Sequence, residues 1–144
     1  METQNAPKSR FRMLVVADQR LLRRGLLALF RASGRLEAAA EADNCEEAIR
    51  SAAAIMPDLV IIDWTLRADA IQMACAIAAL CPHSRLIVLD DTLRILNVRT
   101  ALDLGAMGYW TKRARFADIA AAAERILAGE PAFCPAARKY LGKG

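Results

Sequence analysis

The sequence predicts an α/β fold, a doubly wound five-stranded parallel sheet with five helices, and three observations support it. Five short apolar runs alternate with five segments whose apolar residues recur at helical spacing. The apolar runs are nearly continuous, which is typical of strands that are buried on both faces. The 144 residues suffice for one domain with a sizeable core. We therefore expect strands and helices to alternate along the chain, joined by right-handed crossovers.

The expected strands are stretches of aliphatic and β-branched residues, at 12–18, 36–41, 58–63, 86–90 and 107–111. The expected helices follow them, at 19–32, 44–56, 68–80, 93–104 and 116–128. The second strand is short, which favours a place at the sheet edge, and the third is the most apolar, which favours the centre.

Capping residues and helix breakers justify the helix boundaries. Asp43 or Asn44 can cap the second helix, and Glu46 and Glu47 favour its positive end. Every expected helix is followed by a stop signal, in chain order Gly34, Pro57, Pro82, Gly105 and Gly129. We expect residues 1–10 to form a flexible N-terminal tail, residues 11–130 the folded domain and residues 131–144 the start of a C-terminal linker.

The composition narrows the class of protein. No apolar run approaches the roughly 20 residues that a membrane span needs, and the N-terminus does not resemble a secretory signal. The net charge of +4 is interpreted as solvated helix faces, because basic residues are not interleaved with aromatic ones. The cysteines lack CxxC spacing and predict reduced thiols in a cytoplasmic protein: Cys45, Cys75, Cys81 and Cys134.

Charged residues lie at the ends of the first, third, fourth and fifth expected strands. Asp18, Asp63 and Asp90 close the first, third and fourth strands, and Lys112 closes the fifth. In an open parallel sheet the carboxyl ends of the strands line the ligand crevice. Three carboxylates and one ammonium group are therefore expected at one edge, a layout that suits the acceptance of a phosphoryl group.

Residues 12–140 resemble the receiver domain of bacterial two-component response regulators. The most specific segment is 101–112, Ala-Leu-Asp-Leu-Gly-Ala-Met-Gly-Tyr-Trp-Thr-Lys, and segments 17–26 and 126–130 match as well. The similarity is greatest to the NarL/FixJ (LuxR-type) branch, whose receivers precede a helix-turn-helix output domain. The resemblance implies a CheY-like, flavodoxin-like fold with strand order 2-1-3-4-5.

The resemblance also assigns roles to individual residues. Asp63 takes the position of the phospho-acceptor, which receives its phosphoryl group from a histidine kinase. Asp18, Asp63 and the backbone carbonyl of Thr65 take the positions of Mg²⁺ ligands. Lys112 takes the position of the lysine that pairs with the phosphoryl group. Tyr109 takes the position of the aromatic switch, which moves inward when a nearby Ser or Thr hydroxyl binds the phosphoryl group.

Three departures from the family pattern indicate a degenerate site. Ala17 replaces the first acid of the metal site, so Mg²⁺ binding is expected to be weak. Asp90 replaces the switch hydroxyl and would repel a phosphoryl group by about 4 kcal/mol at about 4 Å and an effective dielectric of about 20. The loop after Asp63 lacks the family's Met-Pro and glycine, and its Trp64 could cover the pocket or pack in the core. Asp90 could pair with Lys112, cap the next helix, or do both.

Three functions follow, in order of preference. The first is a phosphorylation-independent or weakly phosphorylated receiver of a transcriptional regulator, acting through protein contacts or dimerisation. The alternative is an ordinary Mg²⁺-dependent switch at Asp63. A remote alternative is a flavodoxin-like nucleotide binder or enzyme, which the lack of a Gly-rich phosphate loop disfavours. We expect no enzyme activity, a histidine kinase or other signalling protein as partner, a homodimer, no membrane contact, and DNA contact only through a separate C-terminal helix-turn-helix domain.

Overall fold

The strands form one parallel sheet in the predicted order, β2-β1-β3-β4-β5, with every neighbouring pair parallel. A computed structural model describes residues 10–64 and 69–141 of the chain. The strands are β1 (Phe11–Val16), β2 (Leu36–Ala42), β3 (Leu59–Asp63), β4 (Arg85–Asp90) and β5 (Gly108–Thr111). The order places β3 at the centre and β2 at an edge, as the sequence predicts.

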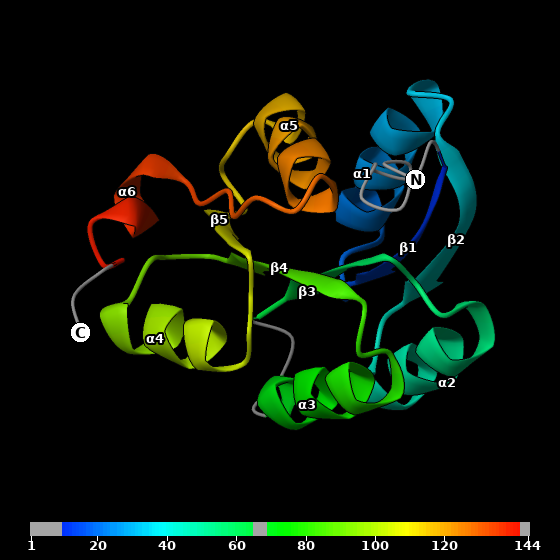
Figure 1. Cartoon of the computed structure of the whole chain (residues 1–144), viewed down its shortest axis with the longest axis horizontal. Helices are drawn as coiled ribbons and strands as arrows, with labels where there is room; N and C mark the ends of the chain where they lie inside the picture. Colours follow the sequence, from blue (N-terminus) through cyan, green and yellow to red (C-terminus); the bar gives the residue numbers. More distant parts are fainter. Residues whose placement is uncertain (1–9, 65–68, 142–144) are drawn as a thin grey trace, which may run out of the picture.

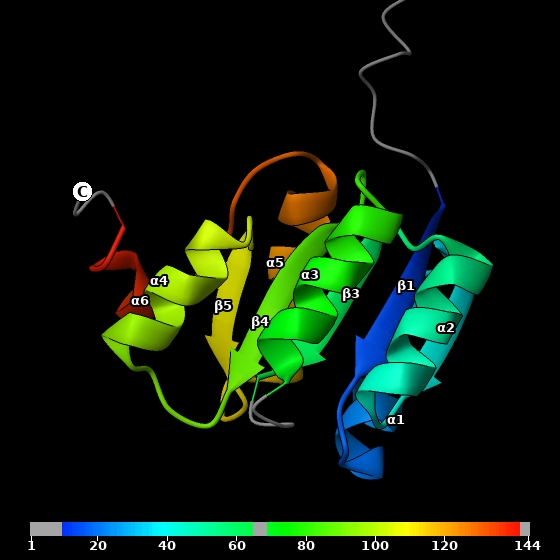
Figure 2. The ribbon, with the colours of Figure 1, turned by 90° about the horizontal axis from the view of Figure 1, so that it is seen from below.

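Helices cover both faces of the sheet. They are α1 (Arg20–Ala32), α2 (Cys45–Ile55), α3 (Ala70–Leu80), α4 (Ile95–Asp103), α5 (Phe116–Leu127) and α6 (Pro135–Arg138). Helices α1 and α5 lie on one face, and α2, α3 and α4 lie on the other (Figure 1). Figure 2 shows α2, α3 and α4 crossing in front of the strands. This sandwich buries the sheet on both faces, which explains the continuous apolar runs.

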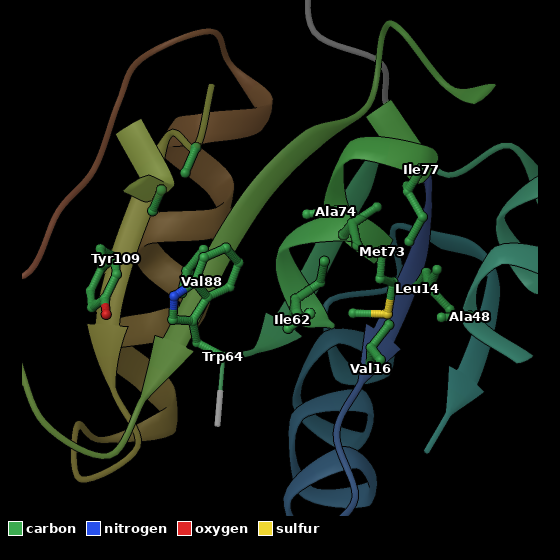
Figure 3. Packing of buried hydrophobic residues seen from close by; sticks show 14 of the residues in the cluster. Leu14, Val16, Ala48, Ile62, Trp64, Met73, Ala74, Ile77, Val88 and Tyr109 are labelled. Atoms are coloured by element: carbon green, nitrogen blue, oxygen red, sulfur yellow. The ribbon is translucent and has the colours of Figure 1, made fainter. Parts of the chain in front are cut away.

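Each strand contributes alternate residues to two separate cores. In β1, Met13 and Val15 face α1 and α5, whereas Leu14 and Val16 face the other helical layer. Figure 3 shows Leu14 and Val16 together with Met73 of α3. This alternation is the ordinary two-residue period of a strand. The two cores fix the sheet between the layers, and so fix where the carboxyl ends of the strands meet.

The helix boundaries show which capping signals act. Asn44 caps α2, because its side-chain oxygen accepts a 2.8 Å hydrogen bond from the backbone N–H of Glu47. Helix α2 ends at Ile55, and Met56 takes a left-handed conformation, with φ of 48°, directly before Pro57. Helix α4 begins at Ile95, two residues later than predicted, so a longer connection follows β4.

The prediction of five helices was incomplete, because a sixth, α6, lies within the segment predicted to start a linker. Pro135 stands in the first turn of α6, where its missing N–H removes no helical hydrogen bond. Ala132, Phe133 and Cys134 are each 6% exposed, and Ala137 is fully buried. Four helical residues are too few for hydrophobic periodicity to reveal, so no pattern in the sequence indicated this helix.

Candidate phospho-acceptor site

Asp63 and Lys112 meet at the carboxyl edge of the sheet. Asp63 is the last residue of the central strand β3, and its side chain is completely buried. Lys112 follows β5, and its backbone N–H donates a 2.9 Å hydrogen bond to the carbonyl of Asp90. From there its ammonium group reaches Oδ2 of Asp63 at 2.9 Å. The predicted convergence of the acceptor position and the lysine is thus present.

A second carboxylate also binds Lys112. Oδ1 of Asp91 lies 3.1 Å from the lysine Nζ, although 64% of the Asp91 side chain is exposed. Burial alone would lower the pKa of Lys112, but the hydrogen bonds that it donates to Asp63 and Asp91 outweigh this effect and raise the pKa. The lysine is therefore a firmly charged ammonium group held between two acids. No pattern in the sequence assigned Asp91 to the site.

Asp90 faces a different neighbour from the one predicted. Its Oδ2 accepts a 2.5 Å hydrogen bond from the hydroxyl of Tyr109 and a 3.1 Å bond from the amide of Asn97. Its Oδ1 accepts a 2.8 Å bond from the backbone N–H of Asp91. Asp90 is 4% exposed and Tyr109 is fully buried. Burial, and next the bond to Asp90, strongly raise the pKa of the Tyr109 phenol.

Both predicted roles of Asp90 were wrong. Its carboxylate does not pair with Lys112, because residues 88 and 90 share one face of β4 and Asp90 therefore turns towards Tyr109 and α4. It does not cap α4 either, since Arg94 is the residue before that helix. Asn97 also belongs to this group. We call Asp90, Tyr109 and Asn97 together the Asp90 network. Asn97 is a single polar residue in a helix, so no pattern in the sequence indicated that it would bind Asp90.

Among the described residues, the predicted side-chain ligands for Mg²⁺ are Asp18 and Asp63. Asp18 is exposed, and at the preceding position Ala17 offers only a backbone carbonyl, which accepts a 2.6 Å bond from Nη1 of Arg23. Asp63 already binds the ammonium of Lys112. In the described parts of the chain, no three His, Cys, Asp or Glu side chains gather in a possible metal site. Thr65, the predicted carbonyl ligand, lies outside the described residues.

Trp64 packs in the core. The side chain is 9% exposed and belongs to the apolar cluster on the α2–α4 face. Figure 3 shows its ring beside Val88 of β4. Its backbone N–H donates a 2.6 Å hydrogen bond to the carbonyl of Leu89, which extends the pairing of β3 with β4 past Asp63. Of the two roles that the sequence left open for Trp64, the structure favours core packing.

Comparison with known proteins decides the family. The family model described as the response regulator receiver domain matches residues 13–124. The chain belongs to the response regulator receiver domain family. Receiver domains of two-component regulators interact with histidine kinases and are not themselves enzymes, as predicted here. Across residues 10–64 and 69–141, no helix is long and apolar enough to cross a membrane.

Curated relatives of this chain are bacterial regulatory proteins. The chain is 29% identical over 121 residues to the transcriptional regulatory protein LiaR of Bacillus subtilis, covering 83% of this chain and 57% of LiaR. It is 27% identical over 125 residues to the response regulator protein VraR of Staphylococcus aureus, covering 86% of this chain and 60% of VraR. The chain therefore spans less than two thirds of the length of these relatives.

Solved structures agree with this assignment. The two-component response regulator of the LuxR family from Aurantimonas sp. SI85-9A1 has a TM-score of 0.83 and 28% identity, covering 94% of this chain and 97% of that one. The receiver domain of NarL from Mycobacterium tuberculosis has a TM-score of 0.76 and 25% identity, covering 85% of this chain and 99% of that one. The chain thus carries a response regulator receiver domain, and it is similar in sequence and fold to one from the LuxR family.

Proposed function

We propose that this receiver domain is an atypical signalling module, in which side chains of the protein fix the switch that phosphorylation sets in an ordinary receiver. The observation that carries the proposal is the hydrogen bond from Tyr109 to Asp90. In the family, an inward aromatic residue accompanies the phosphorylated state. Here Tyr109 is fully buried, and a protein carboxylate holds it there.

The charges around Lys112 support weak phosphorylation. Asp63 and Asp91 already place two carboxylates within 3.1 Å of its ammonium group. A phosphoryl group on Asp63 would compete with the negatively charged Asp91 for this ammonium group. Two like charges about 4 Å apart repel by about 4 kcal/mol at an effective dielectric of about 20. The ionised carboxylate of Asp90 has no proton to donate to the phosphoryl oxygens, unlike the hydroxyl that it replaces.

The accessibility of Asp63 supports the same conclusion. A carboxylate nucleophile must reach the phosphorus atom of its donor, and the Asp63 side chain is completely buried in this arrangement. The described residues also offer an incomplete set of Mg²⁺ ligands. Weak Mg²⁺ binding remains part of the proposal.

Signalling would then proceed by protein contact in the cytoplasm. We include a histidine kinase or another signalling protein as partner, and a homodimer as the working state. Contact with DNA would require the separate domain that LuxR-type relatives use for it. These partners follow from the family assignment and the LuxR-type relatives.

A second candidate is an ordinary phospho-switch at Asp63. The observation that favours it is the intact 2.9 Å contact between Asp63 and Lys112, the pair that the reaction uses. Under this alternative, Asp90 and Asp91 would move away when the phosphoryl group arrives.

Intact mass spectrometry separates the two candidates. The chain and its Asp63→Asn variant are incubated with Mg²⁺ and acetyl phosphate, beside an ordinary receiver as positive control. Our proposal expects no gain of the mass of one phosphoryl group under conditions that modify the control. A gain in the chain that is lost in Asp63→Asn would establish the ordinary switch instead.

A further inference from the structure

The chain after α5 runs along the outer edge of β5. The backbone N–H of Ala132 donates a 2.9 Å hydrogen bond to the carbonyl of Met107, and the N–H of Cys134 donates a 3.2 Å bond to the carbonyl of Tyr109. Both the donors and the acceptors are two residues apart, as in a parallel ladder. We call residues 131–138 the C-terminal strap. Its helix α6 lies beside β5 (Figure 1).

The C-terminal strap joins the two cores around the end of the sheet. Ala132 belongs to the cluster beneath α1 and α5. Phe133, Cys134 and Ala137 belong to the cluster on the opposite face, which also contains Tyr109. The strap therefore closes the edge of the sheet with apolar contacts on both sides. Its removal would expose the carbonyl edge of β5 and parts of both cores to water.

Side chains at the strap and at β5 fit each other closely. The indole Nε1 of Trp110 donates a 2.9 Å hydrogen bond to the carbonyl of Ala132. Nε of Arg138 donates a 3.1 Å bond to the carbonyl of Phe133 and so stabilises the turn into α6. A Cβ at Gly108 would lie 2.9 Å from the carbonyl oxygen of Ala132, closer than such atoms approach. The strap therefore fits only a strand without a side chain at residue 108.

Tyr109 connects the C-terminal strap to the Asp90 network. Its backbone carbonyl accepts the bond from Cys134, while its hydroxyl donates to Asp90. Its ring packs in the same cluster as Phe133 and Cys134. Packed cores switch between discrete arrangements, so an outward rotation of the ring would open the cluster that buries the strap.

We propose that the C-terminal strap is the output element of this domain, held on β5 while Tyr109 is bonded to Asp90 and released when that bond breaks. This inference deepens the proposed function, because it names the segment that reads the state of the switch. The coupling is reciprocal: whatever weakens the Asp90–Tyr109 bond loosens the strap, and whatever loosens the strap weakens that bond.

Amide hydrogen exchange followed by NMR tests the first direction. The Tyr109→Phe variant keeps the ring and removes the bond to Asp90, and Tyr140→Phe is the matched control. We expect the amides of Ala132 and Cys134 to exchange about tenfold faster in Tyr109→Phe, a larger increase than in strand β1, and to be unchanged in Tyr140→Phe. An equal increase in the strap and in β1, or no increase in the strap, would overturn the inference.

A second variant keeps the test decisive if Tyr109→Phe does not fold. Trp110→Phe removes the indole bond to Ala132 without altering Asp90, and we expect faster flipping of the Tyr109 ring together with faster exchange in the strap. Faster exchange in the strap with an unchanged Tyr109 ring would contradict the coupling. These measurements do not depend on phosphorylation. If Asp63 gains the mass of a phosphoryl group and exchange in the strap still responds to Tyr109→Phe, only the proposed function is refuted.

Discussion

The hydroxyl of Tyr109 lies 2.5 Å from Oδ2 of Asp90, inside the protein and at the place where an ordinary receiver carries a switch hydroxyl. Hydrogen bonds to a charged acceptor contribute about 1.5–3 kcal/mol, and leaving a buried carboxylate without its donor costs more. The bond therefore stabilises one position of the aromatic switch without any phosphoryl group. Asn97 of α4 donates to the same oxygen and ties the helix to this position.

Alkaline pH should destabilise the domain through Tyr109. Burial and the bond to Asp90 raise the pKa of this phenol above its ordinary value of 10.0, so the folded state keeps a proton that the unfolded state loses. The stabilisation is complete below pH 10 and falls as pH rises further, by up to about 1.4 kcal/mol per pH unit for one group. Denaturant titrations between pH 8 and 11 would measure this slope.

The two tyrosines provide the control for that slope. We expect a shallower decline above pH 10 in Tyr109→Phe and an unchanged decline in Tyr140→Phe. Lys112 contributes in the same direction, because its pKa is also raised, so some decline should remain in every variant. A slope that is the same in Tyr109→Phe as in the parent chain would show that the phenol is not held as described.

Replacing Lys112 should cost far more stability than replacing its exposed partner. Lys112→Met leaves the fully buried carboxylate of Asp63 without its cation, and we expect a loss of about 3–5 kcal/mol in the free energy of unfolding at neutral pH. Asp91→Ala removes a pair whose acid is mostly exposed, and we expect less than about 1 kcal/mol. Urea denaturation of both variants checks the ranking, and similar losses would contradict it.

Adding one methyl group at Gly108 should disturb the C-terminal strap. The new Cβ would meet the backbone oxygen of Ala132 at 2.9 Å and a methyl of Ile126 at 3.0 Å. Because a backbone atom cannot yield as a flexible side chain can, we expect Gly108→Ala to lower the free energy of unfolding by about 1–3 kcal/mol. Thermal denaturation would measure the loss. A stability equal to that of the parent chain would show that strap and strand are less closely packed.

Restoring the family hydroxyl should restore chemistry at Asp63. Asp90→Thr removes a negative charge at the switch position and supplies the hydroxyl donor that the family uses there. We expect at least about tenfold more modification by acetyl phosphate and Mg²⁺ than in the parent chain, since a like charge at about 4 Å would repel the phosphoryl group by about 4 kcal/mol at an effective dielectric of about 20. Intact mass spectrometry measures the modified fraction. Equal modification of the two proteins would show that Asp90 does not limit the reaction.

The sequence predicted the sheet well because the relevant signals are local. Continuous apolar runs and stop signals such as Pro57 and Gly105 indicated the five strands and the helices between them. The meeting of Asp63 and Lys112 followed from strand topology alone, since parallel strands bring their carboxyl ends to one edge. Neither inference required knowledge of side-chain orientation.

The errors concern orientation and small elements. The partner of Asp90 depends on which face of β4 its side chain occupies. The residues at the end of this strand do not indicate that face. Asn97 and Asp91 joined the site through contacts that no spacing rule identifies. The C-terminal strap was missed because its burial depends on a distant partner, the edge of β5, and its helix has only four residues.

NMR of ring-labelled tyrosine would show whether Asp90 fixes Tyr109 irrespective of phosphorylation. The chain has two tyrosines, so Tyr140 serves as an internal reference. Spectra are recorded with and without Mg²⁺ and the phosphoryl mimic beryllofluoride, for the parent chain and for Asp90→Thr. We predict unchanged Tyr109 signals in the parent chain and shifted signals in Asp90→Thr. A shift of the Tyr109 signals in the parent chain would show that Asp90 does not fix the ring and would identify an ordinary phospho-switch.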